Sequence, residues 1–377
     1  MPKKDSTRLE EVSIDEAVQE LGADPQKDLI EQPVHNRFNE GRGRMKIVGF
    51  ELEDWEREVF DRIRDEHDLL LTSEPLNHRV GQDFLDAEAI STFVYSDLSA
   101  RSLQQFRNLK LVATRSTGFD HIDIEYCKKH DITVCNVPTY ADETVAEHVF
   151  ALLLAISHSI VKAVEKTRTG SFSRKGLQGF DLHGKTMGVI GTGNIGKSVI
   201  KIARGFYMNV LAFDVKPDNQ TASSLGFSYV DMDELLSSAD ILTFHVPGGV
   251  KTRHLISKSE FSKMKDGSVL INTARGDVVD IRALLKALAN NKIAAAGLDV
   301  LPEEPAIREE AELLRSIFAE EHDVQTLFAE HMLTHQPNVL VTPHNAFNTR
   351  EAMERLLDTS VQNILSFAKG ECQNVVA

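Results

Sequence analysis

The chain has 377 residues, of which 42% are hydrophobic and 26% are charged, and its formal net charge at pH 7 is −15. This length favours two domains over one, and the composition is typical of a globular protein. The acidic balance, with no dense run of Lys and Arg, argues against a nucleic-acid partner, because a polyanion is bound through a basic face.

Cysteine usage and hydropathy indicate the compartment. The three cysteines, Cys127, Cys135 and Cys372, form no CxxC pair or other metal-like spacing, so we expect no metal site. Their odd number is a poor disulfide framework, so we expect a reducing environment. The longest clean apolar run, Val149–Ile156, is far shorter than the roughly 20 residues that span a bilayer. Because the first residues also lack the apolar core of a secretory signal, we expect a cytoplasmic protein with no membrane partner.

Residues 1–44 form a polar N-terminal extension with 7 basic and 10 acidic residues. Such a segment buries little apolar surface, so we expect it to be loosely ordered. One short helix is conceivable, with Ser13 as its cap and Glu16 at the capping-box position.

From Met45 the pattern changes to short apolar runs that alternate with helical spacing, as around Trp55–Ile63 and Leu98–Phe106. The expected strands of this first series are Lys46–Glu51, Leu69–Thr72, Ser91–Tyr95, Lys110–Arg115 and Ile132–Val137. Strands that alternate with helices predict βαβ units and a parallel sheet.

A long helix is expected from about Asp142 to Lys166, followed by a second alternating series. Its expected strands are Thr186–Gly191, Val210–Asp214, Ile241–Val246, Ser268–Thr273, Ile293–Val300 and Asn338–Thr342. Residues 302–336, with 9 acidic and 2 basic side chains, are interpreted as an acidic surface excursion, and Asn345 to about Lys369 as a final helix. The fold class is therefore α/β, with two doubly wound parallel-sheet domains.

A glycine-rich turn opens the second series. Gly191, Gly193 and Gly196 form a GxGxxG pattern that follows a predicted strand and begins a predicted helix. The three glycines allow a tight turn, close approach of the backbone to a pyrophosphate, and close packing of helix on strand. The helix N-terminus offers unpaired N–H groups to the phosphates.

An acidic residue completes this pattern, because Asp214 lies at the end of the next predicted strand. A carboxylate at this place accepts hydrogen bonds from ribose hydroxyls and repels a 2′-phosphate, so NAD is favoured over NADP as the cofactor. Lys216, two residues later, leaves some room for the other preference.

Candidate reactive residues lie at or just beyond the ends of three later strands: Arg275, then Asp299 and Glu304, then His344. In an open α/β sheet these carboxyl ends border the ligand crevice. An arginine can bind a carboxylate as a bidentate fork, and a histidine can exchange a proton near neutral pH. A carboxylate such as Glu304 on the imidazole would favour its protonated form. Each residue alone also fits a structural role, so spacing by itself leaves the assignment open.

Several longer motifs occur in one order along the chain. They are Arg115-Ser116-Thr117-Gly118-Phe119-Asp120, Asn136-Val137-Pro138-Thr139-Tyr140, Thr144-Val145-Ala146-Glu147-His148, the Gly191–Gly196 turn, Phe244-His245-Val246-Pro247, Asn272-Thr273-Ala274-Arg275-Gly276, Gly297-Leu298-Asp299-Val300 and Thr342-Pro343-His344-Asn345-Ala346-Phe347. From about Met45 to Gly370 the chain thus resembles the D-2-hydroxyacid dehydrogenase family, most closely its D-lactate dehydrogenase-like members.

The resemblance implies an NAD-dependent oxidoreductase that reduces a small, pyruvate-like 2-keto acid to the D-2-hydroxy acid and catalyses the reverse. Arg275 would bind the substrate carboxylate and keto oxygen, His344 would be the acid/base, and Glu304 would pair with its imidazole. Thr117, Gly118, Tyr140 and Phe347 would lie near the substrate. Positions implied to line the NAD site are Gly191, Gly193, Asn194, Ile195, Gly196, Asp214, Val246, Pro247, Thr252, Thr273, Ala274 and Asp299.

The same resemblance implies a flavodoxin-like substrate domain formed by residues 45–141 and 345–377, a Rossmann NAD domain at 142–344, and a homodimer. Glycerate-, glyoxylate- and branched keto-acid-type substrates stay open, because the region Tyr95–Ala100 has no clear counterpart of an aromatic that some D-lactate dehydrogenases carry. A non-catalytic NAD-sensing protein, as some relatives with this fold are, is the alternative from another class.

Overall fold

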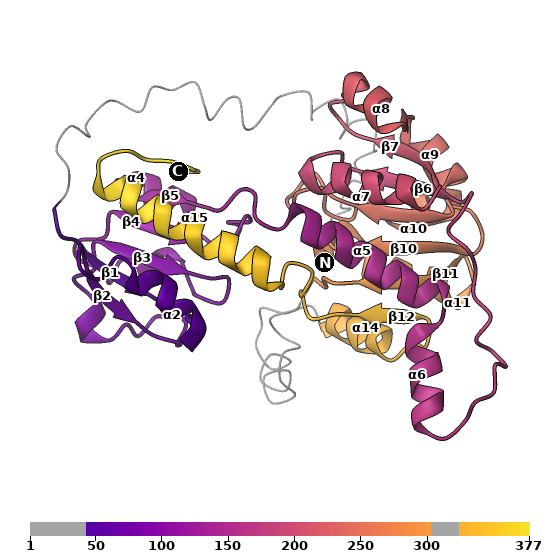
Figure 1. Ribbon diagram of the computed structural model, residues 1–377, viewed down its shortest axis with the longest axis horizontal. Helices are drawn as coiled ribbons and strands as arrows, with labels where there is room; N and C mark the ends of the chain where they lie inside the picture. The colour runs from indigo at the N-terminus through magenta and orange to yellow at the C-terminus, as the bar shows by residue number, and fades with distance from the viewer. Residues whose placement is uncertain (1–42, 303–323) are drawn as a thin grey trace, which may run out of the picture. The chain divides into compact units, whose positions relative to one another are not determined.

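The computed structural model describes residues 43–302 and 324–377, which separate into two compact units (Figure 1). The larger unit contains residues 142–302 and 324–347, and the smaller unit contains residues 43–141 and 348–377. The conceivable helix behind Ser13 and the residue Glu304 lie outside the described residues.

The smaller unit is built on a five-stranded parallel sheet with strand order β2-β1-β3-β4-β5. Its strands are β1 (Lys46–Gly49), β2 (Asp68–Leu71), β3 (Ala89–Thr92), β4 (Leu111–Thr114) and β5 (Thr133–Cys135). Its helices are α2 (Asp54–Asp61), η1 (Gln82–Phe84), α3 (Ala100–Leu103), α4 (Ile124–Lys129) and α15 (Arg350–Ala368). This is the predicted doubly wound parallel sheet.

Helix α15 returns from the far end of the sequence to cover this sheet (Figure 1). Leu357, Ile364 and Phe367 are buried with residues of β1 and β4 in one core. The helix begins at Arg350 because Thr349 caps it, its Oγ1 accepting from the amide of Ala352 at 3.3 Å. The prediction that the helix begins at Asn345 was therefore wrong by several residues.

Among the described residues of the larger unit, seven parallel strands form one sheet with the order β12-β11-β10-β9-β6-β7-β8. They are β6 (Thr186–Ile190), β7 (Asn209–Phe213), β8 (Ser228–Tyr229), β9 (Ile241–Phe244), β10 (Ser268–Asn272), β11 (Ile293–Leu298) and β12 (Val339–Val341). The helices are α5 (Asp142–Ser157), α6 (Ile160–Arg168), α7 (Asn194–Gly205), α8 (Asn219–Leu225), α9 (Met232–Ser238), α10 (Lys258–Lys263), η2 (Gly276–Val278), α11 (Ile281–Ala289) and α14 (Val324–Thr334).

Two apolar cores cover the two faces of this sheet, one including residues of α9 and α11 and the other residues of α5 and α7. Burial on both faces explains why its central strands are continuous apolar runs. All of these strands pair in parallel, so the carboxyl ends of β6, β9, β10, β11 and β12 lie at one edge of the sheet.

Two predictions for the larger unit were wrong. The single long helix Asp142–Lys166 is broken into α5 and α6, because Ser159 adopts the left-handed conformation with φ 50°. Strand β8 was missed, since two residues give no periodic pattern. No single helix among the described residues is long and apolar enough to cross a membrane, and α5 and α6, which meet at 59°, reach such a composition only when taken together.

Candidate functional site

The glycine-rich turn joins β6 to α7 in the larger unit. Gly191 has φ 92°, and a Cβ atom there would lie 2.4 Å from the carbonyl oxygen of His245. A Cβ on Gly196 would lie 2.1 Å from the oxygen of Gly191, whereas one on Gly193 would meet nothing within 4 Å. Packing therefore requires glycine at the first and third places, and the second faces the open space that a close ligand needs. Asn194 and Ile195 begin α7 directly after it.

Asp214, just after β7, is bonded to this turn. Its Oδ2 accepts from the amide of Thr192 at 2.6 Å and from the Thr192 hydroxyl at 2.8 Å, and its Oδ1 accepts from the amide of Lys216 at 2.9 Å. The Thr192 hydroxyl also lies 2.8 Å from the hydroxyl of Tyr229 on β8. The carboxylate that was predicted to face the ribose is therefore fixed beside the glycine-rich turn.

The loop after β9 carries Val246, Pro247 and Thr252. The Thr252 hydroxyl donates to the carbonyl oxygen of Pro247 at 2.7 Å, which closes the loop after β9 into a compact turn. Gly248 within this loop lies against Arg275, since a Cβ there would be 3.0 Å from its Cγ. The loop thus packs against the side chain of Arg275.

Arg275 and His344 line one cavity of about 220 Å³. They follow β10 and β12, whose carboxyl ends share an edge of the sheet. The remaining lining residues are Gly276, Asp277, Val300, Leu301 and Pro302. The structure therefore brings together the predicted carboxylate-binding cation and the predicted acid/base.

Backbone contacts fix the turn that carries Arg275. The side chain of Asn272, 1% exposed, donates to the carbonyl oxygen of Arg275 at 2.9 Å and accepts from the amide of Ala274 at 3.0 Å. The Nη1 of Arg275 donates to the carbonyl oxygen of Ala274 at 2.8 Å. Gly276 is packed so tightly that a Cβ would lie 2.1 Å from the carbonyl carbon of Leu301.

His344 has an unusual backbone, with φ 50° in the left-handed region. Its amide donates to the carbonyl oxygens of Asp299 and Thr342, both at 2.9 Å. Its ring meets that of Phe347 edge to face, with centroids 6.3 Å apart and planes at 72°. Backbone hydrogen bonds on one side and an aromatic contact on the other set the place of the imidazole.

Asp299, 1% exposed, is the anion that holds this loop together. Its Oδ1 accepts from the Thr342 hydroxyl at 2.5 Å and the Asn345 amide at 2.8 Å, and its Oδ2 accepts from the Ala346 amide at 2.9 Å. Burial raises the pKa of this carboxyl, but hydrogen bonds from His148, Thr342 and the two amides outweigh burial and hold its pKa below the ordinary value. The carboxylate is thus ionised at neutral pH.

The predicted substrate residues Thr117, Gly118 and Tyr140 belong to the smaller unit. The Thr117 hydroxyl donates to the carbonyl oxygen of Val137 at 2.7 Å, and Gly118 accepts through its carbonyl oxygen from the Ser116 hydroxyl at 2.6 Å. The carbonyl oxygen of Tyr140 accepts from the guanidinium of Arg355 on α15 at 2.7 Å. These bonds fix the loop after β4 and the segment after β5 within their own unit.

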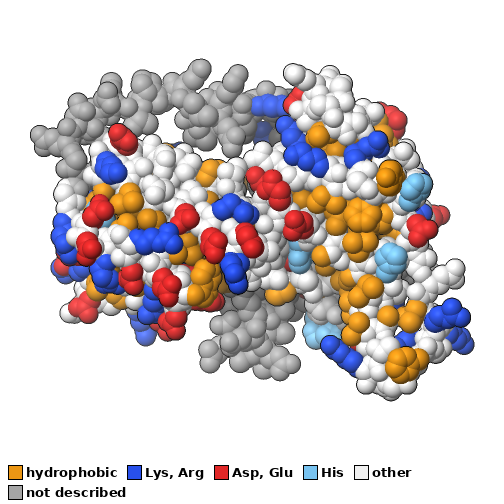
Figure 2. All heavy atoms as spheres, viewed as in Figure 1, with side chains coloured by type: hydrophobic (Ala, Val, Ile, Leu, Met, Phe, Trp, Pro, Cys, Tyr) orange, Lys and Arg blue, Asp and Glu red, His pale blue; other side chains and the backbone are white. Residues whose placement is uncertain are grey.

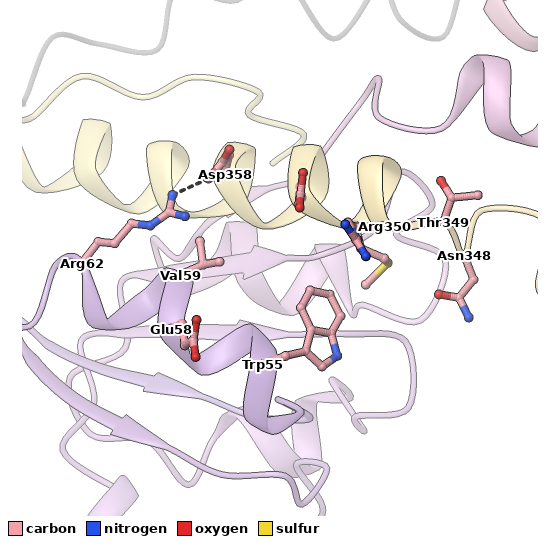
Figure 3. A pocket seen from close by; sticks show the side chains of 10 residues that line it. Trp55, Glu58, Val59, Arg62, Asn348, Thr349, Arg350 and Asp358 are labelled. Carbon is pink, nitrogen blue, oxygen red and sulfur yellow. Dashed lines mark hydrogen bonds and ion pairs between the residues drawn. The ribbon is translucent and has the colours of Figure 1, made fainter.

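A second cavity, of about 730 Å³, lies between α2 and the first turns of α15 in the smaller unit (Figure 3). Trp55 and Arg350 face it, and the ion pair of Arg62 with Asp358, at 2.9 Å, borders it. None of the predicted site residues lines it. Of the two cavities described, the smaller one is lined by both a guanidinium and an imidazole, those of Arg275 and His344.

Comparison with known proteins decides the family. The sequence profile of the D-isomer specific 2-hydroxyacid dehydrogenase NAD binding domain matches residues 150–346. The D-lactate dehydrogenase of Escherichia coli is 34% identical over 342 residues, which cover 88% of this chain and 99% of that protein. The chain belongs to the D-2-hydroxyacid dehydrogenases. It is an NAD-dependent enzyme of this family.

Two further proteins that are similar to this dehydrogenase differ in the substrate after which they are named. The D-lactate dehydrogenase of Aquifex aeolicus, solved with NAD and lactic acid, has a TM-score of 0.76 and 34% identity and covers 86% of this chain and 96% of that one. A glyoxylate reductase of Thermococcus litoralis is 35% identical over 293 residues, covering 76% of this chain and 82% of that protein. The predicted fold class, the D-lactate dehydrogenase-like resemblance and the NAD cofactor are thereby confirmed.

The residues of this dehydrogenase fit NAD on structural grounds as well. The Thr273 hydroxyl, just after β10, is buried and has no hydrogen-bond partner among the described residues. A buried orphan hydroxyl is costly unless a ligand satisfies it. Ala274 follows it at 7% exposed, and the glycine turn leaves open space at Gly193.

Sequence reasoning gave no role to several residues of the dehydrogenase that the structure connects to the site. Asn272 braces the Arg275 turn, Tyr229 shares a hydroxyl contact with Thr192, and His148 contacts Thr342 and Asp299. Two of them, Asn272 and His148, lie in motifs that carried the resemblance, so the motifs marked them without showing what they contact.

Proposed function

We propose that this D-2-hydroxyacid dehydrogenase reduces a small, pyruvate-like 2-keto acid to the D-2-hydroxy acid and catalyses the reverse, with His344 as the acid/base. The observation that carries the proposal is the shared cavity of Arg275 and His344 at the carboxyl edge of the sheet. Two D-lactate dehydrogenases among its relatives, one of them solved with lactic acid, support this substrate class.

The chemistry follows from these two side chains. The guanidinium of Arg275 binds the substrate carboxylate as a fork and polarises the keto oxygen. The protonated imidazole of His344 gives its proton to that oxygen, and in the reverse direction the neutral ring removes the hydroxyl proton. NAD, when bound, would supply the hydride for reduction and accept it in the reverse direction. Glu304, which lies outside the described residues, is proposed to pair with the imidazole and favour its protonated form.

The proposed NAD site uses the described residues at the same edge. Asp214 would accept from the ribose hydroxyls, and its charge would disfavour a 2′-phosphate. The residues proposed to line the site are Gly191, Gly193, Asn194, Ile195, Gly196, Asp214, Val246, Pro247, Thr252, Thr273, Ala274 and Asp299. For Asp299 this role is added to the loop contacts described above.

We propose residues 142–344 as the NAD domain and residues 45–141 with 345–377 as the substrate domain. Thr117 and Gly118 would meet the substrate carboxylate through the backbone, while Tyr140 and Phe347 would lie near the rest of the substrate. The contact of the Phe347 ring with that of His344 supports a place beside the reacting group for this aromatic.

Steady-state oxidation of NADH with pyruvate, glyoxylate, hydroxypyruvate and a branched 2-keto acid tests the substrate class. Ranking by kcat/KM is informative because that ratio reports differential binding of the transition state. We expect pyruvate to rank first. A glyoxylate-first ranking would favour the second candidate, which the relative from Thermococcus litoralis supports; no NADH oxidation with any of the four would refute the proposal.

The variant His344→Asn tests the acid/base. Asparagine tolerates the left-handed backbone at this place, so the substitution removes the imidazole without adding backbone strain. We expect turnover to fall by about 10²–10⁴-fold, the usual contribution of a positioned proton donor. Turnover near that of wild type would exclude His344 from proton transfer.

We also propose a homodimer in the cytoplasm. Hydrophobic side chains gather over α5 and α6 on the face drawn in Figure 2, and Phe172, just beyond α6, is 83% exposed. Ile160, Val161 and Val164 of α6 are also exposed. Such a patch marks an interaction surface. Sedimentation of the wild type and of Phe172→Ser tests the dimer, and cell fractionation tests the compartment.

A further inference from the structure

His148 lies on α5 and contacts the loop that carries His344. Its Nε2 is 3.1 Å from the hydroxyl of Thr342 and 3.4 Å from Oδ1 of Asp299. Its side chain is 18% exposed, so these contacts are mostly shielded from water. The histidine comes from the motif Thr144–His148, which the proposed reaction does not use.

The hydrogen-bond network determines which way the bond of His148 runs. The Thr342 hydroxyl spends its single hydrogen on Oδ1 of Asp299, so toward His148 it can offer only a lone pair. The carboxylate oxygen is an acceptor as well. Both atoms that face Nε2 are therefore acceptors, and Nε2 must carry the hydrogen.

The groups that accept from His148 also hold the His344 loop. Asp299 accepts from the amides of Asn345 and Ala346, on the carboxyl side of His344, while its carbonyl oxygen accepts from the His344 amide. The Thr342 carbonyl oxygen accepts from the same amide. A rotation of the Asp299 side chain would break its bond to the Thr342 hydroxyl on one side of the left-handed residue and its bonds to the Asn345 and Ala346 amides on the other.

We propose that His148 is a positioning residue for catalysis: the hydrogen bond that its Nε2 donates keeps Thr342 and Asp299 in the arrangement that holds His344 at the cavity. The inference rests on the proposed function, in which His344 transfers the proton. The polar contacts of His148 run to Thr342 and Asp299, so its effect on turnover passes through the loop. A displacement of about 1 Å at a reacting group can cost on the order of 10²-fold in rate.

A set of three variants tests the hydrogen bond against simple packing. His148→Leu removes the donor, and His148→Gln restores an N–H near the place of Nε2. His148→Asn is the matched control, because its shorter side chain puts its N–H near the place of Nδ1 instead. We expect kcat for pyruvate to fall by about 10–100-fold in the Leu and Asn variants and to stay close to that of wild type in Gln. Among the residues proposed to line the NAD site only Asp299 belongs to this network, so the dissociation constant for NADH should change by less than kcat in all three variants.

The outcomes separate this inference from the proposed function. If His344→Asn loses turnover while His148→Leu keeps the wild-type kcat, the positioning role is wrong and the acid/base role stands. Equal losses in His148→Leu and His148→Gln, with unchanged circular dichroism, would also overturn it, since the donor would then not matter. If His344→Asn keeps turnover, the proposed function itself fails. Loss in Leu and Asn together with rescue in Gln supports the inference.

Discussion

The buried carboxylate of Asp299 offers the sharpest test of how the His344 loop is held. In Asp299→Asn one oxygen becomes an amide group of nearly the same shape. Oδ1 faces Thr342, Asn345 and His148, whereas Oδ2 faces only the amide of Ala346. The remaining carbonyl oxygen should therefore take the place of Oδ1, which leaves the Ala346 amide opposite another donor.

The magnitude follows from that loss. One hydrogen bond to a charged, buried acceptor is worth about 1.5–3 kcal/mol, and the other bonds weaken when the charge is removed. We expect the free energy of unfolding to fall by about 2–4 kcal/mol at pH 7, measured by urea denaturation followed by circular dichroism, and kcat to fall with it. Asn345→Ala is the matched control, because it keeps the amide that bonds to Asp299.

The pH dependence has a definite sign. The pKa of Asp299 is lowered in the folded protein, so its stabilisation is fully present above the ordinary pKa of an aspartate, about 3.9. This stabilisation is lost as the pH falls through the pKa that Asp299 has in the folded protein. The stability difference between wild type and Asp299→Asn should therefore narrow in acid. Equal stability at pH 7, or a difference that widens in acid, would refute this reasoning.

Three other substitutions test separate parts of the structure. Asp214→Ala should raise the ratio of NADPH to NADH turnover, because the carboxylate that repels a 2′-phosphate is removed; steady-state kinetics with both cofactors measures it. Gly276→Ala should lower stability by about 1–3 kcal/mol through overpacking, since its Cβ would lie 2.1 Å from the Leu301 backbone, and thermal unfolding would show this. Arg115→Met should lower the melting temperature, because the carbonyl oxygens of Phe50 and Glu51 lose their buried donor; an unchanged melting temperature would contradict the role of that guanidinium.

Much of the fold could be predicted from the sequence, because strands buried on both faces leave continuous apolar runs. β6 (Thr186–Ile190) and β10 (Ser268–Asn272) begin at the predicted residues. β3 was less well predicted: it is Ala89–Thr92, and the predicted run Ser91–Tyr95 continues into the following loop. Strand pairing, and not hydropathy alone, ends that element, since Phe93 and Tyr95 donate their amides to the side chain of Glu51.

The site could be predicted only in part. The motifs suggested Arg275 and His344, but local spacing could not show that one cavity contains both. The break at Ser159 was missed because a left-handed serine leaves no trace in the apolar pattern. His148 is 194 residues from Thr342 and about 150 residues from Asp299 in the sequence. Contacts over such separations arise from packing, which the periodicity of the sequence does not encode. The roles assigned to the substrate and cofactor residues stay predictions.

The return of α15 to the sheet of the smaller unit has a consequence for how the chain folds during synthesis. Residues 142–347 can complete their own sheet as soon as they leave the ribosome. The sheet β1–β5 is made first, but the side chains of α15 that cover it, Leu357, Ile364 and Phe367, are made only at the end of translation. Contacts of such long sequence separation form slowly and leave an apolar sheet face exposed meanwhile. A chain cut short after Phe347 would keep that face uncovered and should aggregate through it.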